Sequence, residues 1–312
     1  MSTNPPLSGH QFRIRHGKYE AIIASIGATL RSLTGDGRDL VVPFDADEVR
    51  PAYRGVTLAP WPNRVVDGRY SFNGVQQQLA LTEPARGHAL HGLACWLDFR
   101  PETYVDASPN HVELFAMIEP QAGYPHRIRL EVAYRLDDDG LHTTVTATNM
   151  GPSAAPYGTG PHPYLAVGAA GLDRAVVSIP AASIATTVGE RLLPGEVVSV
   201  AEVPEFDFRQ ARVLGDVAID HAYGDIIREP EGLARVTVQN PDCSGVQLVW
   251  DEACPWVQIH TADLTAGHPG HRIGLAVEPM TCPPDAFNSG TDLVVLEPGA
   301  SHTAWWRIAT LD

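Results

Sequence analysis

The 312-residue chain carries a formal net charge of −15, because 22 Lys and Arg residues face 37 Asp and Glu residues. Nucleic acid is therefore not expected as a partner, since phosphate backbones are held by clustered Lys and Arg. The first residues lack the charged and apolar regions of a secretion signal, and no run of about 18 apolar residues predicts a membrane span, so we expect a soluble cytoplasmic protein with no membrane partner. Four widely spaced cysteines form no CxxC pair, which indicates reduced thiols.

Short strands bounded by Gly, Pro, Asn or Asp are predicted along the chain. The clearest alternation runs over residues 127–136, where every second side chain from Ile128 to Leu136 is apolar. Asp137 to Gly140 supply a turn and the alternation resumes over residues 141–147, which predicts a hairpin. Further strands are predicted over residues 111–118, 235–239, 246–250, 256–261, 293–296 and 303–308.

The fold class follows from these elements. No long stretch of helical periodicity competes with the strands, and many short antiparallel strands predict an all-β sandwich or barrel. The chain length favours one large antiparallel β-sandwich. Because no linker or low-complexity tract interrupts the sequence, a single domain over residues 1–312 is expected.

Glu278 stands where an ordinary core strand would carry an apolar residue. Side chains alternate along a strand, so the small residues Gly274 and Ala276 share its face and clear space beside it. Pro279 cannot donate to a sheet ladder and is expected to end the strand, which would place the carboxylate at the rim of the sheet. Such an acid suits a base beside a small-molecule cleft, and a solvent-facing glutamate before a proline turn is the alternative interpretation.

Four more polar clusters are candidates for chemistry: PWPNR (60–64), GHALHG (87–92), PHPYL (161–165) and IDHAY (219–223). The prolines on both sides of His162 restrict its backbone and would aim the imidazole with little loss of entropy. Glycines beside His88 and His91 allow close approach of the backbone. Arg64 is a possible ligand anchor and Asp220 a possible hydroxyl partner, although a surface ion pair or a turn would use the same residues.

Trp256, Gln258 and His260 share one face of the predicted strand that contains them. An aromatic ring packs on the C–H edges of a sugar while an amide hydrogen-bonds its hydroxyls. This face therefore suits a sugar, although a solvated sheet face would show the same pattern.

Taken in order, these residues resemble the aldose 1-epimerase (galactose mutarotase) family, from about Phe12 to Ile308. The matching residues are Asn63-Arg64, Leu90-His91-Gly92, His162-Pro163-Tyr164, Asp220, Gln258, Glu278-Pro279, Pro284-Asp285 and Asn288. The sequence departs from the family pattern at three positions, because Met280, Trp256 and His260 stand where the family often has Gln, Gly and Tyr. These departures concern the identity of the aldose.

The resemblance implies a galactose mutarotase-like supersandwich whose concave face binds a pyranose without a metal or an organic cofactor. The implied activity is that of a carbohydrate isomerase, which interconverts the α and β anomers of a free aldose by acid/base ring opening and reclosure. Glu278 would be the general base and His162 the general acid. The implied sugar-binding residues are Asn63, Arg64, His91, Asp220 and Gln258. The partner is the small-molecule sugar, and the protein is expected as a monomer or homodimer.

The acid and the base should influence each other's titration. If Glu278 and His162 lie close together, each should favour the charged form of the other, lowering the pKa of the glutamate and raising that of the histidine. The pH profile would then have an acidic limb set by Glu278 and an alkaline limb set by His162.

Three alternative functions stay open. One is a metal-dependent β-barrel enzyme that uses His88, His91 and Glu278. Another is a non-catalytic sugar-binding protein on the same fold. The third is a hexose-6-phosphate 1-epimerase, for which Arg54 and Arg86 are candidate phosphate contacts.

Overall fold

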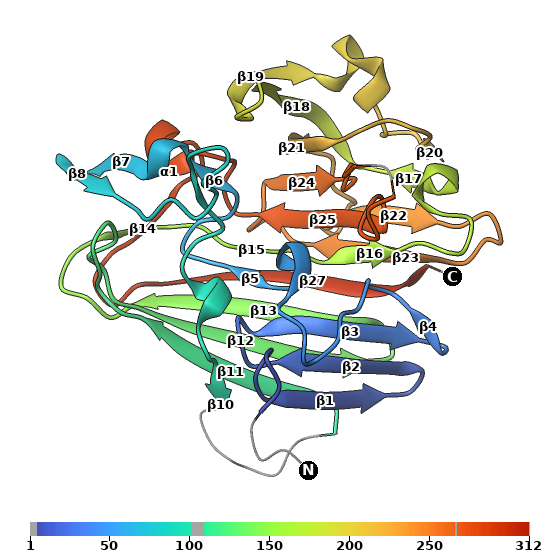
Figure 1. Cartoon of the computed structure of the whole chain (residues 1–312), viewed down its shortest axis with the longest axis horizontal. Coiled ribbons are helices and arrows are strands. Elements are labelled where there is room, and N and C mark those ends of the chain that lie inside the picture. Colours follow the sequence, from blue (N-terminus) through green and yellow to red (C-terminus); the bar gives the residue numbers. More distant parts are fainter. Residues whose placement is uncertain (1–4, 102–108, 266, 312) are drawn as a thin grey trace.

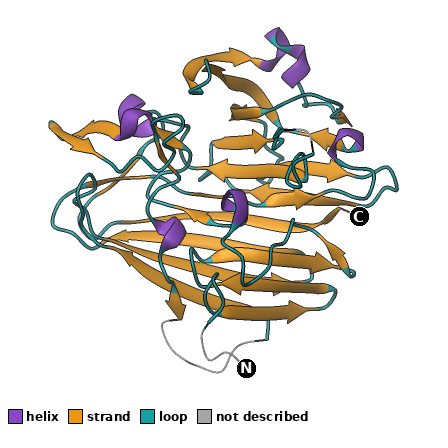
Figure 2. Cartoon of the chain, viewed as in Figure 1, coloured by secondary structure: helices purple, strands orange, loops and turns teal. Residues whose placement is uncertain are grey.

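Almost all of the regular structure in this computed structural model is β-strand (Figure 2). The structure describes residues 5–101, 109–265 and 267–311, so the first four residues of the segment considered as a secretion signal lie outside it. Within these ranges the one α-helix is α1 (Ala286–Ser289), and the 3-10 helices are η1 (Pro51–Tyr53), η2 (Val66–Gly68), η3 (Ala94–Trp96), η4 (Leu172–Arg174), η5 (Val200–Glu202) and η6 (Pro204–Phe206). None of the helices found there has the length and apolar character that crossing a bilayer requires.

The largest sheet forms one layer of a sandwich. Its nine antiparallel strands, counted over the described residues, follow the order β10 (Arg100–Pro101), β11 (His111–Ile118), β12 (Ile128–Asp137), β13 (Gly140–Asn149), β27 (Ser301–Leu311), β23 (Gly245–Trp250), β22 (Ala234–Gln239), β17 (Val176–Ser178) and β20 (Arg212–Val213). Its buried side supplies much of the core.

Two sheets lie side by side in the second layer (Figure 1). The first has the order β1 (Gln11–His16), β2 (Tyr19–Ala24), β3 (Thr29–Gly35), β4 (Arg38–Asp39), and the second, six-stranded sheet has the order β16 (Tyr164–Ala166), β25 (Gly274–Met280), β24 (Trp256–His260), β21 (Asp220–Ile226), β18 (Ala181–Val188), β19 (Leu193–Ser199). A bridge between Val41 and Leu165 joins them. Because β1 and β2 contact β12, and β16 contacts β23, this layer covers the nine-stranded sheet.

Short strand pairs form the loops that surround the outer face of the six-stranded sheet. They are β5 (Thr57–Leu58) with β15 (Gly160–Pro161), β6 (Arg64–Val65) with β9 (Ala89–Leu90), β7 (Arg69–Phe72) with β8 (Val75–Gln78), and β14 (Ala155–Tyr157) with β26 (Val294–Leu296). The β5–β15 and β6–β9 pairs bring the polar sequence clusters at 60–64 and 87–92 to this face.

The predicted all-β sandwich is confirmed, and the predicted strands recur with small shifts at their ends. The predicted hairpin is β12 and β13, in which Asp137 pairs with Gly140 across a two-residue turn. The alternating side chains from Ile128 to Leu136 are at most 3% exposed, as a core-facing strand requires. β11, β22, β23, β24 and β26 match the other predicted segments, whereas β27 extends beyond residues 303–308 at both ends.

β25 has the two faces that its sequence predicts. Leu275 and Val277 are fully buried in the core, and Glu278 lies on the opposite face. The alternative of a solvent-facing glutamate is wrong, because Glu278 is only 2% exposed.

The prediction that Pro279 ends the strand at the rim of the sheet is wrong. β25 continues to Met280, and its residues 276–280, Pro279 among them, pair with β24. The amides two residues before and two residues after Pro279 donate to carbonyls of the 159–163 segment, so the nitrogen of Pro279 also faces that segment and points away from β24. The proline therefore removes no hydrogen bond from the β24–β25 ladder.

Candidate active site

The outer face of the six-stranded sheet brings several of the predicted site residues together through strand register. Gln258 on β24 lies opposite Glu278 on β25, and Asp220 on β21 lies opposite His260 on β24. Residues that pair directly across antiparallel strands share a face. The side chains of Glu278, Asp220, Gln258 and His260 therefore point to the same side of the sheet. The sheet thus supplies three of the seven predicted site residues.

The remaining catalytic candidate, His162, contacts Glu278 from the segment that precedes β16. Its Nε2 lies 3.4 Å from Oε1 of Glu278, and the exposed fractions of the two side chains are 7% and 2%. The two proposed proton-transfer groups are therefore adjacent and shielded from bulk water, as a pair acting on neighbouring atoms of one substrate must be.

The backbone of His162 is fixed by two hydrogen bonds to the segment before β5. Its amide donates to the carbonyl of Val56 at 3.1 Å, and its carbonyl accepts from the amide of Gly55 at 2.8 Å. Gly55 has a φ of +70°, and a Cβ there would lie 2.0 Å from the carbonyl oxygen of Leu30. Only glycine fits this position.

Asn63 and His91 hold each other in place. The amide of Asn63 donates to Nδ1 of His91 at 3.2 Å, and the amide of His91 donates to the carbonyl of Asn63 at 2.8 Å. Both residues have left-handed backbones, with φ of 53° and 63°. Such strain at non-glycine residues is typical of functional sites. Because Nδ1 accepts a hydrogen bond, the proton of the neutral ring is on Nε2, which makes His91 a donor there.

Arg64 and Asp220 belong to one polar network. Arg64 donates to both carboxylate oxygens of Glu83, at 2.8 and 3.1 Å, and its Nη2 lies 3.9 Å from Oδ2 of Asp220. Gln258 donates to Oδ1 of Asp220 at 2.7 Å. Burial opposes the charge of Arg64, but its hydrogen bonds to Glu83 and the charge of Asp220 outweigh burial and raise its pKa. The guanidinium is thus a fixed, charged donor on this face.

Asp285 braces the strand that carries Arg64. Its amide donates to the carbonyl of Arg64 at 2.7 Å, while its Oδ1 accepts from the amide of Val66 at 2.9 Å and from the side chain of Asn288 at 2.7 Å. Asp285, with Asn288 bound to it, therefore positions β6, whereas Pro284 lines a cavity together with Asp220 and Gln258 of the sheet.

Burial governs the titration of the central groups. Burial, with the nearby charge of Asp220, raises the pKa of Glu278 well above its usual value. Burial lowers the pKa of His162 to about 3, and burial together with His162 lowers the pKa of His91 well below its usual value. The expected mutual attraction of Glu278 and His162 is thus outweighed, because desolvation of each charge is the larger effect, and both pKa shifts are opposite to the sequence expectation.

Glu278, His162 and the neighbouring Gln258 each carry a buried polar atom that has no hydrogen-bond partner in the described part of the chain. Among the described residues, Oε2 of Glu278, Oε1 of Gln258 and Nδ1 of His162 have no hydrogen-bond partner. Buried polar groups are nearly always hydrogen-bonded in proteins, so such a concentration indicates a place where a polar ligand supplies the missing partners. A polyhydroxylated molecule fits this requirement.

His88 does not join the other histidines. The amide of Asp67 donates to its Nδ1 at 3.2 Å, and its Nε2 lies 2.9 Å from the carbonyl of Arg191. Both ring nitrogens are therefore engaged by backbone groups, and the described residues contain no cluster of three or more His, Cys, Asp or Glu side chains able to hold a metal ion. The alternative site built on His88, His91 and Glu278 is not formed.

The two arginines considered as phosphate contacts differ. Arg86 donates to Glu83 at 2.7 Å and to the carbonyl of Glu190 at 3.1 Å, so its charge is already paired. The guanidinium of Arg54 lies 6.0 Å from the centre of the Tyr164 ring, and Tyr164 lies 5.5 Å from the ring of His162. No ion pair links Arg54 to a carboxylate of the described chain.

Two residues near the site were not predicted from the sequence. The ring of Tyr53 lies 4.7 Å from that of His91 and 6.2 Å from that of His162, which makes it a side wall for both. Glu83 orients Arg64, as described above. Neither residue stands in a distinctive motif, so only the three-dimensional contacts reveal them.

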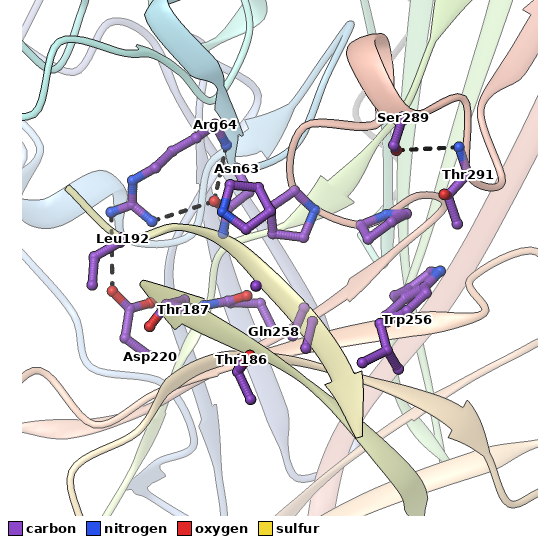
Figure 3. Close-up of a pocket in the computed structure, with 17 residues that line it drawn as sticks. Asn63, Arg64, Thr186, Thr187, Leu192, Asp220, Trp256, Gln258, Ser289 and Thr291 are labelled. Atoms are coloured by element: carbon purple, nitrogen blue, oxygen red, sulfur yellow. Dashed lines mark hydrogen bonds and ion pairs between the residues drawn. The ribbon is translucent and has the colours of Figure 1, made fainter. Parts of the chain in front are cut away.

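A cavity of about 180 Å³ adjoins the polar network (Figure 3). Asn63, Arg64, Asp220 and Gln258 line one end of it, and Trp256 lines the other. Glu278, His162 and His91 are not among the lining residues. Gln258, which lies opposite Glu278, therefore stands between the cavity and the pair formed by Glu278 and His162. Trp256, a departure from the family pattern, thus faces a cavity next to the site.

The fold and the site together define a β-sandwich with a buried carboxyl–imidazole pair on a polar sheet face, and comparison with known proteins identifies its family. Residues 10–309 match the aldose 1-epimerase family. The chain is 36% identical over 308 residues to "uncharacterized protein YihR" of Escherichia coli K12, covering 98% of this chain and 95% of that protein. The chain belongs to the aldose 1-epimerase family.

Solved structures agree with this fold. The GalM/aldose epimerase homologue from C. elegans superposes with a TM-score of 0.83 at 20% identity, covering 97% of this chain and 98% of the other. The galactose 1-epimerase from Lactobacillus acidophilus NCFM gives a TM-score of 0.77 at 19% identity, covering 97% and 95%. The galactose mutarotase-like sandwich expected from the sequence is confirmed.

Proposed function

We propose that this protein is an aldose 1-epimerase that interconverts the α and β anomers of a free aldose. The observation that supports this most is the 3.4 Å separation of His162 Nε2 from Glu278 Oε1 on a buried polar face. Ring opening removes a proton from the C1 hydroxyl and delivers one to the ring oxygen, and both oxygens are bonded to the same carbon. Two adjacent proton-transfer groups suit this chemistry.

The pair acts by holding one proton. A neutral carboxyl beside a neutral imidazole contains the same number of protons as a carboxylate beside an imidazolium, so the two arrangements interconvert without exchange with solvent. In the second arrangement Glu278 takes the C1 hydroxyl proton and His162 protonates the ring oxygen. After rotation about C1–C2 the roles reverse and the ring closes on the other face.

The surrounding residues hold the sugar. His91 donates from Nε2 beside His162, which suits assistance at the ring oxygen. Arg64, Asp220 and Gln258, fixed by their mutual contacts, bind the hydroxyls remote from C1. Asn63 positions two of these residues, because its amide donates to the ring of His91 and its side-chain oxygen accepts from the amide of Arg64. The matched galactose 1-epimerase supports a neutral hexose as substrate.

The test is the rate at which freshly dissolved α-glucose and α-galactose change optical rotation. We expect acceleration by the wild type, a loss of about 10² to 10⁴ in kcat/KM for Glu278→Gln, and sugar binding by that variant within roughly tenfold of wild type by calorimetry. Glu297→Gln, at an exposed position, is the matched control and should be fully active. Binding without acceleration by the wild type would instead establish a sugar-binding protein.

Arg54 favours a second candidate, a hexose-6-phosphate 1-epimerase. Its buried Nε has no hydrogen-bond partner among the described residues, and its guanidinium faces the Tyr164 ring beside His162. A phosphate group on the sugar would form an ion pair with this guanidinium. If this candidate holds, Arg54→Gln raises KM for glucose 6-phosphate at least tenfold and leaves KM for glucose within twofold.

A further inference from the structure

Arg50 is a buried cation that takes no part in the contacts described above. It immediately precedes η1 and is only 6% exposed. Its Nη1 donates to Oγ1 of Thr29 at 2.9 Å and to the carbonyl of Ile26 at 3.3 Å, while its Nη2 donates to the carbonyl of Cys95 at 2.5 Å. The guanidinium therefore joins the segment between β2 and β3 to η3.

No carboxylate of the described chain neutralises this charge. Its three acceptors are uncharged, and its Nε has no hydrogen-bond partner among the described residues. Burial lowers the pKa of Arg50, and the groups that act against this effect are the thiol of Cys95 and the phenol of Tyr53. A buried charge without an ionic partner costs free energy. It also acts on its surroundings more strongly than a paired or solvated charge does.

The indole of Trp96 covers the guanidinium on one side. The ring centre lies 4.4 Å from Cζ of Arg50, a cation–π distance, while Trp96 itself is 55% exposed. Gly27 leaves space on another side, because a Cβ there would lie 3.0 Å from Nη1 of Arg50 and 2.6 Å from the carbonyl oxygen of Cys95. An aromatic ring thus closes a side that water would otherwise occupy, which limits the screening of this charge.

Cys95 connects Arg50 to the segment that carries His91. Its carbonyl accepts from Arg50, and its thiol donates to the carbonyl of His91 at 3.0 Å. The next residue back, Ala94, donates from its amide to the carbonyl of Ala59 at 2.9 Å. One residue therefore separates the guanidinium from the backbone of His91.

A second connection runs along the chain from Arg50 to His162. η1 follows Arg50 directly and contains Tyr53, whose ring lies 4.7 Å from that of His91 and 6.2 Å from that of His162. The amide of Gly55, five residues after Arg50, donates to the carbonyl of His162 at 2.8 Å. Tyr53 has a left-handed backbone with a φ of 55°. A strained segment of this kind needs its ends fixed, and Arg50 anchors the first of them.

Several other charged or titratable groups also face the two imidazoles. They are Tyr53 of η1, Arg64 of β6 with its partner Glu83, Tyr164 of β16 with the neighbouring Arg54, Asp220 of β21, His260 of β24 and Glu278 of β25. Burial is the main cause of the lowered pKa of His162 and of His91, and the charge of Arg50 acts in the same direction on both. Arg64 is paired with Glu83, whereas Arg50 has no such partner in the described chain.

We propose that Arg50 is a positioning residue for the acid–base site: it fixes the segments that carry His91 and Tyr53, and its unneutralised charge keeps the shared proton on Glu278 rather than on His162. This inference rests on the proposed epimerase function. When His162 does take the proton, an imidazolium opposed by this charge is a stronger acid toward the ring oxygen of the sugar.

The experiment follows the protonation of the two imidazoles and needs no substrate. Protein labelled with ¹⁵N in histidine is titrated by NMR from pH 8 to the lowest pH at which circular dichroism shows an intact fold. His91→Asn and His162→Asn assign the signals. The dependence of kcat/KM on pH, measured by polarimetry with fresh α-glucose and α-galactose, is the second readout.

Arg50→Met removes the charge and keeps an apolar stem. We expect the titration of His162, and the acidic limb of kcat/KM with it, to move to higher pH by about 0.5 unit or more, because the charge that opposes the imidazolium is gone. Arg50→Lys keeps a cation and should stay within about 0.2 unit of wild type. Arg31→Met, which removes a half-buried guanidinium bonded to Gln11 and Phe44, is the matched control and should also stay within about 0.2 unit.

Trp96→Ala tests the same charge at a position that is 55% exposed, with little risk to folding. The variant keeps Arg50 and admits water to its guanidinium, so screening increases. The titration of His162 should therefore move in the same direction as in Arg50→Met and by a smaller amount.

Cys95 tests the connection to His91. Cys95→Ala removes the donor to the carbonyl of His91, and Cys95→Ser keeps one. We expect kcat/KM at neutral pH to fall by about threefold or more in the alanine variant and to stay within about twofold of wild type in the serine variant. Equal losses in the two variants, or none in Cys95→Ala, would overturn this part of the role of Arg50.

The outcomes separate the two proposals. A His162 titration that is the same in Arg50→Met and wild type, or that moves equally in Arg50→Met and Arg50→Lys, overturns the role of the charge and leaves the epimerase function standing. If Arg50→Met does not fold, an unchanged titration in Trp96→Ala overturns that role by itself. Absence of turnover of both sugars by the wild type overturns the epimerase function, and the part of Arg50 in the reaction with it, whatever the titrations show.

Discussion

Nε2 of His162 lies 3.4 Å from Oε1 of Glu278, yet burial opposes the charge of both groups. Their proximity is therefore imposed by the fold, through the β24–β25 register on one side and the backbone hydrogen bonds of His162 on the other. An active site that holds groups in an unfavourable state lowers the stability of the folded chain. This cost is measurable.

Glu278→Gln should stabilise the protein, and increasingly so as pH rises. In the unfolded chain a glutamate ionises near 4.5, and in the folded chain the pKa of Glu278 is well above that value. The stability that this group contributes is complete below pH 4.5 and falls by about 1.4 kcal/mol per pH unit up to the folded pKa. The variant lacks this loss, so urea unfolding from pH 5 to pH 8 should show a growing difference from wild type.

Two features make this measurement specific. His162 is present in both proteins, so its own titration largely cancels in the difference. Glu297→Gln, at an exposed position, makes the same substitution away from the site and is measured in parallel. A constant difference between Glu278→Gln and wild type across the pH range would mean that Glu278 ionises normally in the folded protein.

Gly92→Ala should destabilise the protein strongly and disturb His91. Gly92 has a φ of +76°, and a Cβ there would lie 2.1 Å from the carbonyl oxygen of Ala59. Gly74→Ala is the matched control, because Gly74 has a φ of +77° and nothing within 4 Å of the added Cβ. The control should lose about 1 kcal/mol for its left-handed backbone alone, and Gly92→Ala more than about 3 kcal/mol in chemical denaturation. Equal losses would show that the segment moves aside freely.

The strands and the unusual position of Glu278 on one of them could be predicted from sequence, because each rests on a local pattern. Period-two alternation over residues 127–147 predicts the β12–β13 hairpin, since burial of every second side chain is a property of the segment itself. The acid at 278 stands out because its strand neighbours are small and apolar. The order of the polar motifs along the chain then indicates the family, which the match over residues 10–309 confirms.

The parts that sequence reasoning missed depend on contacts between distant segments. Nothing near Glu83 indicates that it orients Arg64, and nothing near Leu192 indicates that its hairpin roofs a cavity. Pro279 was expected to end β25 because the side of the strand that its nitrogen faces is not visible in sequence. The pKa directions were wrong for a related reason, since the depth of burial is a property of the whole fold. The roles of the site residues and the single-domain organisation stay predictions.

Asp285→Ala should weaken substrate binding more than turnover. The change removes the acceptor for Val66 and Asn288 and places alanine at a φ of 62°, so we expect a loss of about 2 to 3 kcal/mol of stability. Because β6 carries Arg64, which is proposed to bind a hydroxyl remote from C1, KM should rise severalfold with a smaller change in kcat. Asp285→Asn keeps an acceptor oxygen and tolerates the left-handed backbone, so it should stay near wild type in both measurements. A fall in kcat alone would place Asp285 in the chemistry instead.

Exhaustive chelation should leave activity unchanged. The proposed steps move protons between Glu278, His162 and the sugar and require no Lewis acid. Both ring nitrogens of His88 are engaged by the backbone, so this residue should contribute stability and hairpin position. The measurement is polarimetric activity before and after dialysis against EDTA, with mock dialysis as the control. Loss of activity that zinc or manganese restores would return His88 and His91 to consideration as metal ligands.

The dependence of kcat/KM on pH should be bell-shaped with an unusually wide plateau. The working pair holds one proton, so activity falls when acid adds a second and when alkali removes the last. Burial lowers the pKa of His162 to about 3 and raises that of Glu278. The acidic limb is then set mainly by His162 and the alkaline limb by Glu278, which is the reverse of the assignment expected from ordinary pKa values. No limb should appear near pH 6.5, where an exposed histidine titrates.

His162→Asn tests this assignment. The variant should lose at least about 10² of the maximal rate, the usual contribution of one proton-transfer group, and its residual activity should follow a single titration because only Glu278 remains. A wild-type profile that falls on the alkaline side near pH 6.5 would show that His162 titrates as an ordinary imidazolium acid. If the variant keeps both limbs of the wild-type profile, another group supplies one of them. His91, whose ring lies 5.0 Å from that of His162, is then the first candidate for the acid.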